Sequence, residues 1–312
     1  MIFDTEIMHD PTIRYRGRFA PSPTGPLHFG SLIAAVGSYL QARANGGEWL
    51  VRMEDLDRPR EERGAAEAIL RILEEYGFEW DGPVVRQSER SGAYAAALAQ
   101  LRSGGFVFPC ACSRREISDS MLGTATEPVY PGTCRNGIAP GRPARAVRMR
   151  VDAAVISFSD RVQGRVAQDL AREVGDFVVK RADSLFAYQL AVVVDDFEQG
   201  ITEVVRGADL LASTPRQILL QQRLGYPTPR YAHLPVAVNP SGEKLSKQTR
   251  AAPLEAAQAR QQLRRALRFL GQDPPAALTG DPISTLWTWA RENWRAEKVP
   301  RERSIGEFSC DL

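Results

Sequence analysis

Two segments that lie far apart in the chain carry residues suited to binding the phosphates of a nucleotide. The first, residues 21–31 (PSPTGPLHFGS), places His28 and Gly30 where a rigid loop meets the start of a helix. Amides at a helix N-terminus attract phosphate, a glycine lets a ribose or purine approach the backbone, and a histidine can donate to the α-phosphate. A loop histidine is also common without any ligand. The expected ATP contacts here are Pro21, Gly25, His28, Gly30 and Ser31.

The second segment, residues 241–247 (SGEKLSK), carries Lys244 and Lys247 in a turn that follows an apolar strand. Lysines at this spacing can bind the β- and γ-phosphates and neutralise departing pyrophosphate. A lysine pair in a glycine–serine loop is more often a solvated surface feature. The two segments together favour ATP binding. A glycine-rich P-loop is excluded, because the pattern G-x-x-x-x-G-K is absent from the sequence.

Three of the four cysteines, Cys110, Cys112 and Cys134, cluster in the sequence, whereas Cys310 stands apart. Such uneven placement does not suit a disulfide scaffold and indicates a metal site. Zinc normally takes four ligands, and no histidine lies between residues 29 and 232. No general base accompanies the cluster, so we expect one structural zinc ion; three reduced, buried cysteines are the alternative. Candidates for the fourth ligand are Tyr130, Glu116, Asp119, Glu127 and water.

The overall composition is that of a globular protein with room for one large and one smaller domain. The chain has 312 residues, of which 43% are hydrophobic and 25% charged, and a formal net charge of only +2. Any nucleic-acid partner must therefore be met by local basic patches. No apolar run approaches the length of a membrane span, and the first residues are acidic, so we expect a cytoplasmic monomer without membrane contact.

Strand and helix signals alternate through the first third of the chain. A short strand at 18–20 is stopped by prolines, and apolar residues then recur at helical spacing until Asn45-Gly46-Gly47. The next strand, at 48–55, has Trp49, Val51 and Met53 on one face. This alternation predicts an α/β fold with a doubly wound parallel, Rossmann-type sheet. Two further helices are expected at 61–76 and 91–102.

Residues 105–180 interrupt the alternation with Cys, Gly, Pro and Arg, apart from one strand at 146–151, and we interpret them as an insertion. The α/β rhythm then returns at 187–194, 202–206, the helix 215–224 and the strand 234–238, and helices at 253–270 and 283–294 form a tail. The predicted organisation is therefore a catalytic domain at 1–104 and 181–238, an inserted subdomain at 105–180, and a lysine loop with a helical region at 239–312.

Several motifs in their order along the chain resemble those of class I aminoacyl-tRNA synthetases. Residues 21–31 and 244–248 (KLSKQ) resemble the HIGH and KMSKS signatures of that class, and the resemblance extends from Tyr15 to the end. Four other segments look like the glutamyl branch: 18–25 (RFAPSPTG), 51–57 (VRMEDLD), 205–210 (VRGADL) and 233–235 (HLP). Because only a short region follows Gln248, the chain is most similar to the shortened paralogues that glutamylate the queuosine base in the anticodon of tRNA(Asp).

The resemblance implies a glutamate pocket between the two phosphate-binding segments. Arg18 and Arg206 would hold the γ-carboxylate of L-glutamate, and Glu54 and Tyr188 its α-ammonium group. The loop residues Phe19, Ala20, Pro21 and Ser22 would line this pocket. Magnesium-bound ATP would be the second substrate, with Lys247 contacting its phosphates as the lysine loop closes. The implied catalytic residues are His28, Ser31, Lys244 and Lys247.

Two positions depart from the class signatures. Ser31 stands where HIGH has its second histidine, and Gln248 replaces the final serine of KMSKS. The hydroxyl of Ser31 can hydrogen-bond in place of the missing imidazole, so we expect an effect on rate more than on mechanism. The shortened paralogues that the chain resembles share both departures.

The resemblance also favours Tyr130 as the fourth zinc ligand, within an inserted acceptor-binding subdomain. Residues 130–134 (YPGTC) place the tyrosine one tight turn from Cys134, although a phenol must lose its proton to bind the metal. Queuosine-bearing tRNA(Asp) would be the acceptor. A truncated glutamyl-tRNA synthetase that charges tRNA(Glu), and a non-catalytic RNA-binding paralogue, are the alternatives. Candidate RNA contacts are Arg114, Arg115, Arg135, Arg142 and Arg145 in the insertion and Arg260, Arg264, Arg265 and Arg268 in the tail.

Overall fold

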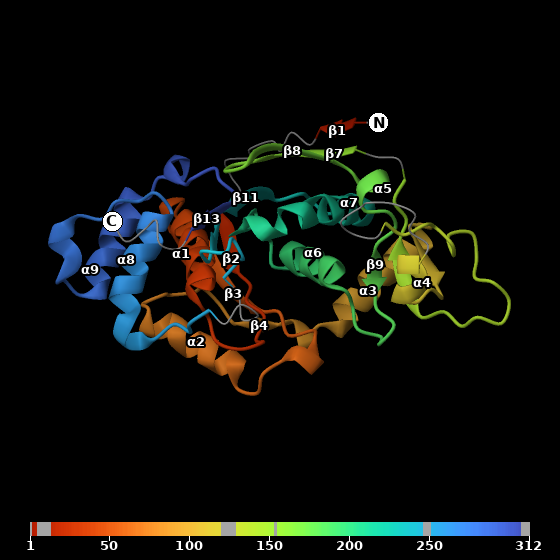
Figure 1. Cartoon of the computed structure of the whole chain (residues 1–312), viewed down its shortest axis with the longest axis horizontal. Coiled ribbons are helices and arrows are strands. Elements are labelled where there is room, and N and C mark those ends of the chain that lie inside the picture. Colours follow the sequence, from red (N-terminus) through yellow and green to blue (C-terminus); the bar gives the residue numbers. More distant parts are fainter. Residues whose placement is uncertain (1, 5–13, 120–128, 153–154, 246–250, 307–312) are drawn as a thin grey trace.

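The computed structural model describes residues 2–4, 14–119, 129–152, 155–245 and 251–306. The molecule is elongated in Figure 1, with the tail helices α8 and α9 at one end and the cysteine-bearing region around α4 and β9 at the other. The central sheet and its covering helices lie between them. No helix in these ranges is long and apolar enough to cross a membrane.

The centre of the fold is a parallel sheet in two adjoining parts. Strands β2, β3 and β4 pair in parallel, and so do β10 and β11. The amide of Thr202, just before β10, donates to the carbonyl of Arg16 at 2.9 Å, so β2 and β10 lie side by side. The predicted parallel sheet is confirmed. The strands are β2 (Arg16–Phe19), β3 (Glu48–Met53), β4 (Val85–Arg86), β10 (Glu203–Gly207) and β11 (Arg230–Leu234).

Helices cover both faces of this sheet, as a doubly wound fold requires. On one face, α1 (Phe29–Ala44) packs in a core that includes Trp49, Val51 and Met53, the side chains expected to share a face. On the other face, α6 (Tyr188–Glu198) and α7 (Thr214–Leu224) form a second core with α3 (Ser91–Ser103). Because side chains alternate along a strand, Arg18, Arg52 and Arg206 point toward α6 and α7.

The segment predicted as an insertion contains a small antiparallel sheet and a hairpin. Strands β5, β6 and β9 form the small sheet, and Cys110 is the last residue of β5. In the hairpin of β7 and β8, Asp160 of β7 pairs with Tyr231 of β11, so this part of the segment joins the large sheet. The domain boundaries remain a prediction. The elements are β5 (Val107–Cys110), α4 (Arg114–Asp119), β6 (Ala146–Met149), β7 (Val155–Asp160), β8 (Gly164–Asp169), α5 (Leu170–Glu173) and β9 (Val178–Lys180), with β1 (Ile2–Asp4) beside β7.

The tail packs against the first half of the chain. Helices α8 (Ala259–Phe269) and α9 (Ile283–Asn293) share the apolar core of α1. The indole of Trp287 donates to the carbonyl of Tyr76 at 2.8 Å and that of Trp294 to the side chain of Gln41 at 2.9 Å. Strands β12 (Val236–Val238) and β13 (Ser304–Gly306) pair in parallel and tie the tail to the sheet region.

Some element boundaries differ from the sequence prediction. The helix expected at 61–76 is α2 (Ala65–Glu75), because Gly64 adopts a left-handed conformation with φ of 80° and ends the preceding turn. The strand expected at 234–238 is broken at Pro235, which cannot donate to a ladder, and so becomes the end of β11 and the separate strand β12. Residues 187–194 lie at the start of the helix α6.

Candidate active site

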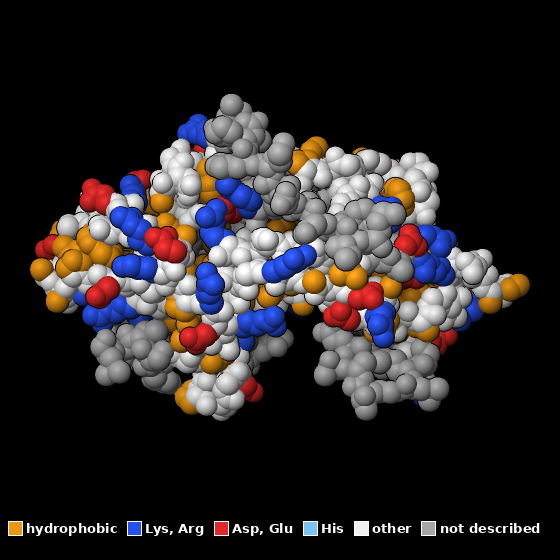
Figure 2. All heavy atoms as spheres, turned by 90° about the horizontal axis from the view of Figure 1, so that it is seen from above, with side chains coloured by type: hydrophobic (Ala, Val, Ile, Leu, Met, Phe, Trp, Pro, Cys, Tyr) orange, Lys and Arg blue, Asp and Glu red, His pale blue; other side chains and the backbone are white. Residues whose placement is uncertain are grey.

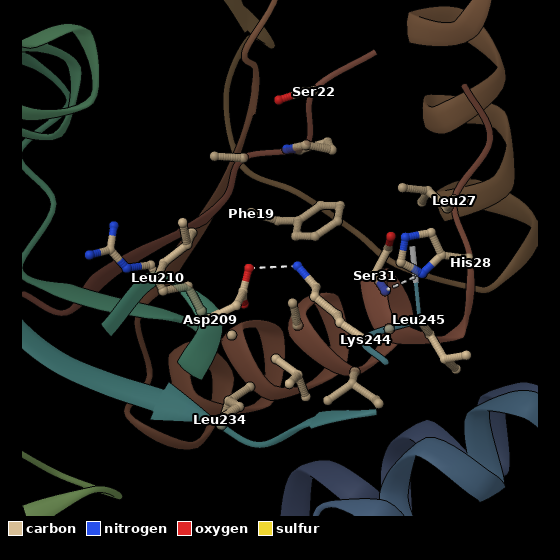
Figure 3. A pocket seen from close by; sticks show the side chains of 18 of the residues that line it. Phe19, Ser22, Leu27, His28, Ser31, Asp209, Leu210, Leu234, Lys244 and Leu245 are labelled. Atoms are coloured by element: carbon tan, nitrogen blue, oxygen red, sulfur yellow. Dashed lines mark hydrogen bonds and ion pairs between the residues drawn. The ribbon is translucent and has the colours of Figure 1, made fainter. Parts of the chain in front are cut away.

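One cavity of about 700 Å³ lies at the carboxyl ends of the parallel strands and contains most of the predicted site. It joins the loop after β2, the start of α1, the end of β10 and the beginning of the lysine loop (Figure 3). Ligands of open α/β sheets bind at this edge. Among the predicted residues that line it are Arg18, Phe19, Ala20, Pro21, Ser22, His28, Gly30, Ser31, Glu54, Tyr188, Arg206 and Lys244.

His28 caps the helix α1. Its Nδ1 accepts a hydrogen bond from the Ser31 amide at 3.3 Å, as Figure 3 shows. A neutral imidazole that accepts at Nδ1 carries its proton on Nε2, which is the form able to donate to a phosphate. The absence of a side chain at Gly30 leaves room for the imidazole ring of His28, because a Cβ at Gly30 would lie 3.1 Å from Cε1 of His28. Gly25, a predicted ATP contact with φ of 136°, is not among the residues lining the cavity.

Lys244 extends from the lysine loop toward the segment after β10. Its Nζ lies 2.5 Å from Oδ2 of Asp209, and the two side chains point toward one another in Figure 3. Asp209 lies within the VRGADL segment, but sequence reasoning assigned it no role. Lys247 and Gln248 lie outside the described residues, so the contacts predicted for them are untested.

A buried network of charges supports the predicted glutamate pocket. Arg18 and Arg52, exposed by 3% and 0%, both bind Asp196 of α6, at 3.1 and 2.8 Å. Arg52 also lies 3.3 Å from Glu54. Burial raises the pKa of Glu54 above its ordinary value even though Arg52 and Arg18 oppose the shift. Burial would also raise the pKa of Asp196, but the two arginines hold it below its ordinary value.

Arg206 is a buried cation surrounded by neutral partners. Its Nη2 donates to Thr214 at 2.9 Å and to Gln217 at 2.8 Å, and its Nη1 donates to the hydroxyl of Tyr188 at 3.4 Å. No ion pair joins Arg206 to a carboxylate among the described residues, although it is only 5% exposed. A buried charge normally has an opposite charge beside it. Arg206 therefore has the properties of a group that receives an anionic ligand.

The fourth neutral partner of Arg206 is His233, whose Nε2 accepts from Nε of Arg206 at 3.0 Å. On its other side, Nδ1 of His233 lies 2.6 Å from Oδ2 of Asp160. Burial, together with the charge of Arg206, lowers the pKa of His233 to about 4, although Asp160 opposes this shift. The imidazole is therefore neutral near pH 7. Asp160 and Asp196 lie in no recognisable motif, and His233 belongs to the HLP segment without a predicted role of its own.

The three clustered cysteines converge with Tyr130. All three sulfur atoms lie within 4.8 Å of one another, and the Tyr130 oxygen lies 3.4 Å from Sγ of Cys110 and 3.8 Å from Sγ of Cys112. Tetrahedral zinc with Zn–S bonds of about 2.3 Å needs ligand separations of roughly 3.5 to 3.8 Å. The two tyrosine contacts and the 3.6 Å separation between the sulfur atoms of Cys112 and Cys134 are close to this value. Burial raises the pKa of Tyr130 well above its ordinary value, so a cation would be needed to ionise it.

Of the other side chains considered for the fourth ligand, Glu116 is the one that the described part of the chain includes, and it does not lie with the cysteines. Glu116 accepts from the Ser113 amide at 2.7 Å and from Arg142 at 2.6 Å, and it is not grouped with the cysteines. Glu127 and the side chain of Asp119 lie outside the described part of the chain. Among the described side chains, Tyr130 is therefore the fourth donor that the geometry favours.

Several arginines expected to contact RNA have structural partners. Arg135 binds Asp152 at 2.8 Å, Arg142 binds Glu116, and Arg264 donates to the carbonyl of Pro274 at 2.7 Å. Their contacts with RNA remain a prediction.

Comparison with known proteins identifies the family. A model of class I tRNA synthetases (E and Q), catalytic domain, matches residues 14–272. The glutamyl-Q tRNA(Asp) synthetase of Dechloromonas aromatica is 64% identical over 293 residues, which cover 93% of this chain and 97% of that protein. The protein of the same name from Aromatoleum aromaticum is 58% identical, with 97% of each chain covered. The chain belongs to the glutamyl-Q tRNA(Asp) synthetase family.

Solved structures confirm the fold expected of a glutamyl-Q tRNA(Asp) synthetase. A glutamate tRNA ligase from Elizabethkingia meningosepticum, in complex with its amino acid, aligns with a TM-score of 0.76 and 24% identity over 93% of this chain and 66% of that chain. Glutamate-tRNA synthetase from Elizabethkingia anophelis aligns with a TM-score of 0.78 and 24% identity over 94% of this chain and 68% of that chain. The family model and the relatives named above show that the protein is an enzyme of the class I tRNA synthetase type.

Proposed function

We propose that the protein activates L-glutamate with ATP and transfers the glutamyl group to the queuosine base of tRNA(Asp). The observation that carries this proposal is a cavity that joins Arg206, a buried cation with no carboxylate partner among the described residues, to the phosphate-binding start of α1. An amino acid with a second carboxylate fits this arrangement. The names of the relatives supply the acceptor.

In this proposal the two ends of glutamate are held by opposite charges. Arg206 binds the γ-carboxylate, with Arg18 contributing positive charge from beside it, because a guanidinium matches a planar anion. Glu54 and Tyr188 take the α-ammonium group, one through its charge and one through its hydroxyl. The α-carboxylate is left to react. The loop residues Phe19, Ala20, Pro21 and Ser22 form the adjoining wall of the cavity.

The reaction has two steps. An oxygen of the α-carboxylate attacks the α-phosphorus of ATP, the bond to pyrophosphate breaks, and glutamyl-adenylate forms. A hydroxyl of the acceptor then attacks the activated carbonyl, and AMP leaves. His28, Ser31 and the start of α1 stabilise charge on the α-phosphate, and Lys244 and Lys247 neutralise pyrophosphate. Magnesium would enter with ATP and offset phosphate charge.

The acceptor would be met by local patches. Figure 2 shows a face on which Lys and Arg side chains are interspersed with acidic ones, without one continuous basic field. One zinc ion, held by Cys110, Cys112, Cys134 and Tyr130, would stabilise the small sheet of β5, β6 and β9, in the region that we propose contacts the acceptor. We propose that the enzyme acts as a monomer in the cytoplasm, where its tRNA substrate is found.

The decisive experiment measures glutamate-dependent exchange between ATP and pyrophosphate without tRNA, followed by glutamylation of tRNA(Asp) with and without queuosine. The proposal expects exchange without tRNA and glutamylation only of the queuosine-bearing tRNA. Exchange that strictly requires tRNA(Glu) would favour a truncated glutamyl-tRNA synthetase. Absence of exchange under all conditions would favour a non-catalytic RNA-binding protein.

A further inference from the structure

We propose that Asp160 and His233 are positioning residues. Asp160 fixes the tautomer of the His233 imidazole, and His233 in turn fixes the orientation in which Arg206 meets the side-chain carboxylate of glutamate. The proposal rests on the function proposed above. Neither Asp160 nor His233 lines the cavity, so both would act on the ligand through Arg206.

The three side chains form a buried chain of hydrogen bonds across three strands. Asp160 ends β7, His233 lies in β11, and Arg206 is the cross-strand neighbour of His233 in β10. The Asp160 Oδ2 to His233 Nδ1 distance is 2.6 Å, and the Arg206 Nε to His233 Nε2 distance is 3.0 Å. None of the three is more than 5% exposed. Water therefore does not compete for these bonds.

The surroundings of Asp160 determine which imidazole nitrogen carries the proton. Its Oδ1 accepts from the amides of Val162, Gln163 and His233 at 3.0, 2.9 and 3.1 Å. Oδ2 is left to accept from the imidazole, so the proton of His233 lies on Nδ1. Nε2 is then an acceptor, which is the only form that can bind the N–H of Arg206.

This contact limits how Arg206 can use its remaining donors. Nε is occupied by His233, and both hydrogens of Nη2 are accounted for by Thr214 and Gln217. Within the described part of the chain, Nη1 makes the 3.4 Å bond to Tyr188 and no other, so it retains donor capacity for a carboxylate. A guanidinium fixed in this way need not be ordered when the ligand arrives, which favours binding.

The substitution Asp160→Asn tests the proposal by reversing the tautomer. The three backbone amides require an oxygen at Oδ1, so the new NH₂ group must replace Oδ2 and donate to Nδ1 of His233. The imidazole proton then moves to Nε2 and faces the N–H of Arg206. We expect the KM for glutamate to rise about tenfold or more and the KM for ATP to change less than about twofold in exchange assays.

A matched control is Glu203→Gln, since Glu203 is a buried carboxylate in β10 whose partners, including Gln41, Arg161 and Arg230, lie outside the cavity. This variant should retain the wild-type KM for glutamate. A similar rise in Glu203→Gln would mean that any loss of buried charge has this effect, and would overturn the proposal.

Nitrogen NMR of ¹⁵N-labelled histidine provides a readout that folding alone would not change. The chain has only three histidines, so the His233 signals can be assigned from a His233→Gln variant. Wild-type protein should show the proton on Nδ1 and Asp160→Asn the proton on Nε2. An unaltered tautomer, or an altered tautomer with an unchanged KM for glutamate, would overturn the proposal.

A second pair of variants covers the case in which Asp160→Asn does not fold. The amide oxygen of His233→Gln can reach the position of Nε2 and accept from Arg206, whereas the shorter side chain of His233→Asn cannot. The glutamine variant should therefore keep a lower KM for glutamate than the asparagine variant, and the reverse order would contradict the mechanism. Wild-type protein that shows no glutamate-dependent exchange would instead refute the proposed function itself.

Discussion

Nζ of Lys244 lies 2.5 Å from Oδ2 of Asp209 and so connects the lysine loop to the segment that follows β10. Both residues line the cavity that contains the start of α1 and the predicted glutamate pocket. The ion pair with Asp209 therefore helps to orient Lys244 in the cavity. Binding of ATP would place phosphate and Asp209 in competition for the same ammonium group.

Lys244→Ala should lower kcat/KM for ATP about a hundredfold in pyrophosphate exchange, because one cationic partner of the phosphates is lost. Asp209→Asn should have a smaller effect, since the ammonium group remains. Lys298→Ala is the matched control, because Lys298 is exposed and outside the cavity. An equal loss in Lys244→Ala and Lys298→Ala would contradict a role for Lys244 at the phosphates.

Lys247→Ala should remove about 3 kcal/mol of transition-state stabilisation, by analogy with the loss of one oxyanion donor. The measurement is the rate of pyrophosphate exchange at saturating glutamate and ATP. Unchanged exchange in this variant would refute the assignment of the KLSK segment to ATP phosphates.

Arg206→Lys should raise the KM for glutamate between about tenfold and a hundredfold, because an ammonium group cannot serve His233, Thr214, Gln217 and a carboxylate together. Titration of glutamate in the exchange assay gives this value. Arg230→Lys makes the same change in a neighbouring strand, where the partner is Glu203 at 3.1 Å, and should retain the wild-type KM. If both variants bind glutamate normally, Arg206 does not hold the carboxylate.

Purified protein should contain about one equivalent of zinc by elemental analysis. Cys134→Ser should lose most of the metal, and Tyr130→Phe should bind it more weakly because one of four ligands is removed. Cys310→Ser is the control, since Cys310 was not predicted to be a ligand. Metal-free protein with an unchanged melting temperature would exclude a structural zinc site.

The stability of the protein should fall as the pH is lowered from about 6.5 toward about 4, because His233 resists protonation in the folded state. Its pKa is lowered to about 4, while an unfolded histidine has a pKa of 6.5, so in this window the unfolded chain binds the extra proton. The free energy of unfolding, measured with urea at several pH values, should therefore rise with pH across this window.

His233→Gln provides the comparison, because glutamine does not titrate. Asp160, whose pKa is lowered, makes the free energy of unfolding fall only when the pH drops below its ordinary value of 3.8. Glu54, whose pKa is raised, makes the free energy of unfolding rise as the pH drops. The difference between wild type and His233→Gln isolates the histidine. Parallel pH profiles for the two proteins would show that His233 is not held neutral.

Local features of the sequence determined the main elements and most of the cavity. The prolines after β2, the apolar periodicity of α1 and the alternation of Trp49, Val51 and Met53 are each short-range patterns, and each gave an element that the structure confirms. Residues of the motif at 18–31, together with Lys244, line two walls of the cavity, because residues within one loop stay together in any fold. Their roles in binding ATP and glutamate remain a prediction.

Tertiary structure alone decided which side chains support those residues. Asp160 comes from the predicted insertion, His233 from β11 and Arg206 from β10, and they meet only through the register of these strands. Asp196 likewise reaches Arg18 and Arg52 from the helix α6. Hydrogen bonds between residues so distant in the chain leave no periodic pattern in the sequence. The orientation of Arg206 is therefore a property of the assembled sheet, whereas its presence at the end of β10 is a property of the sequence.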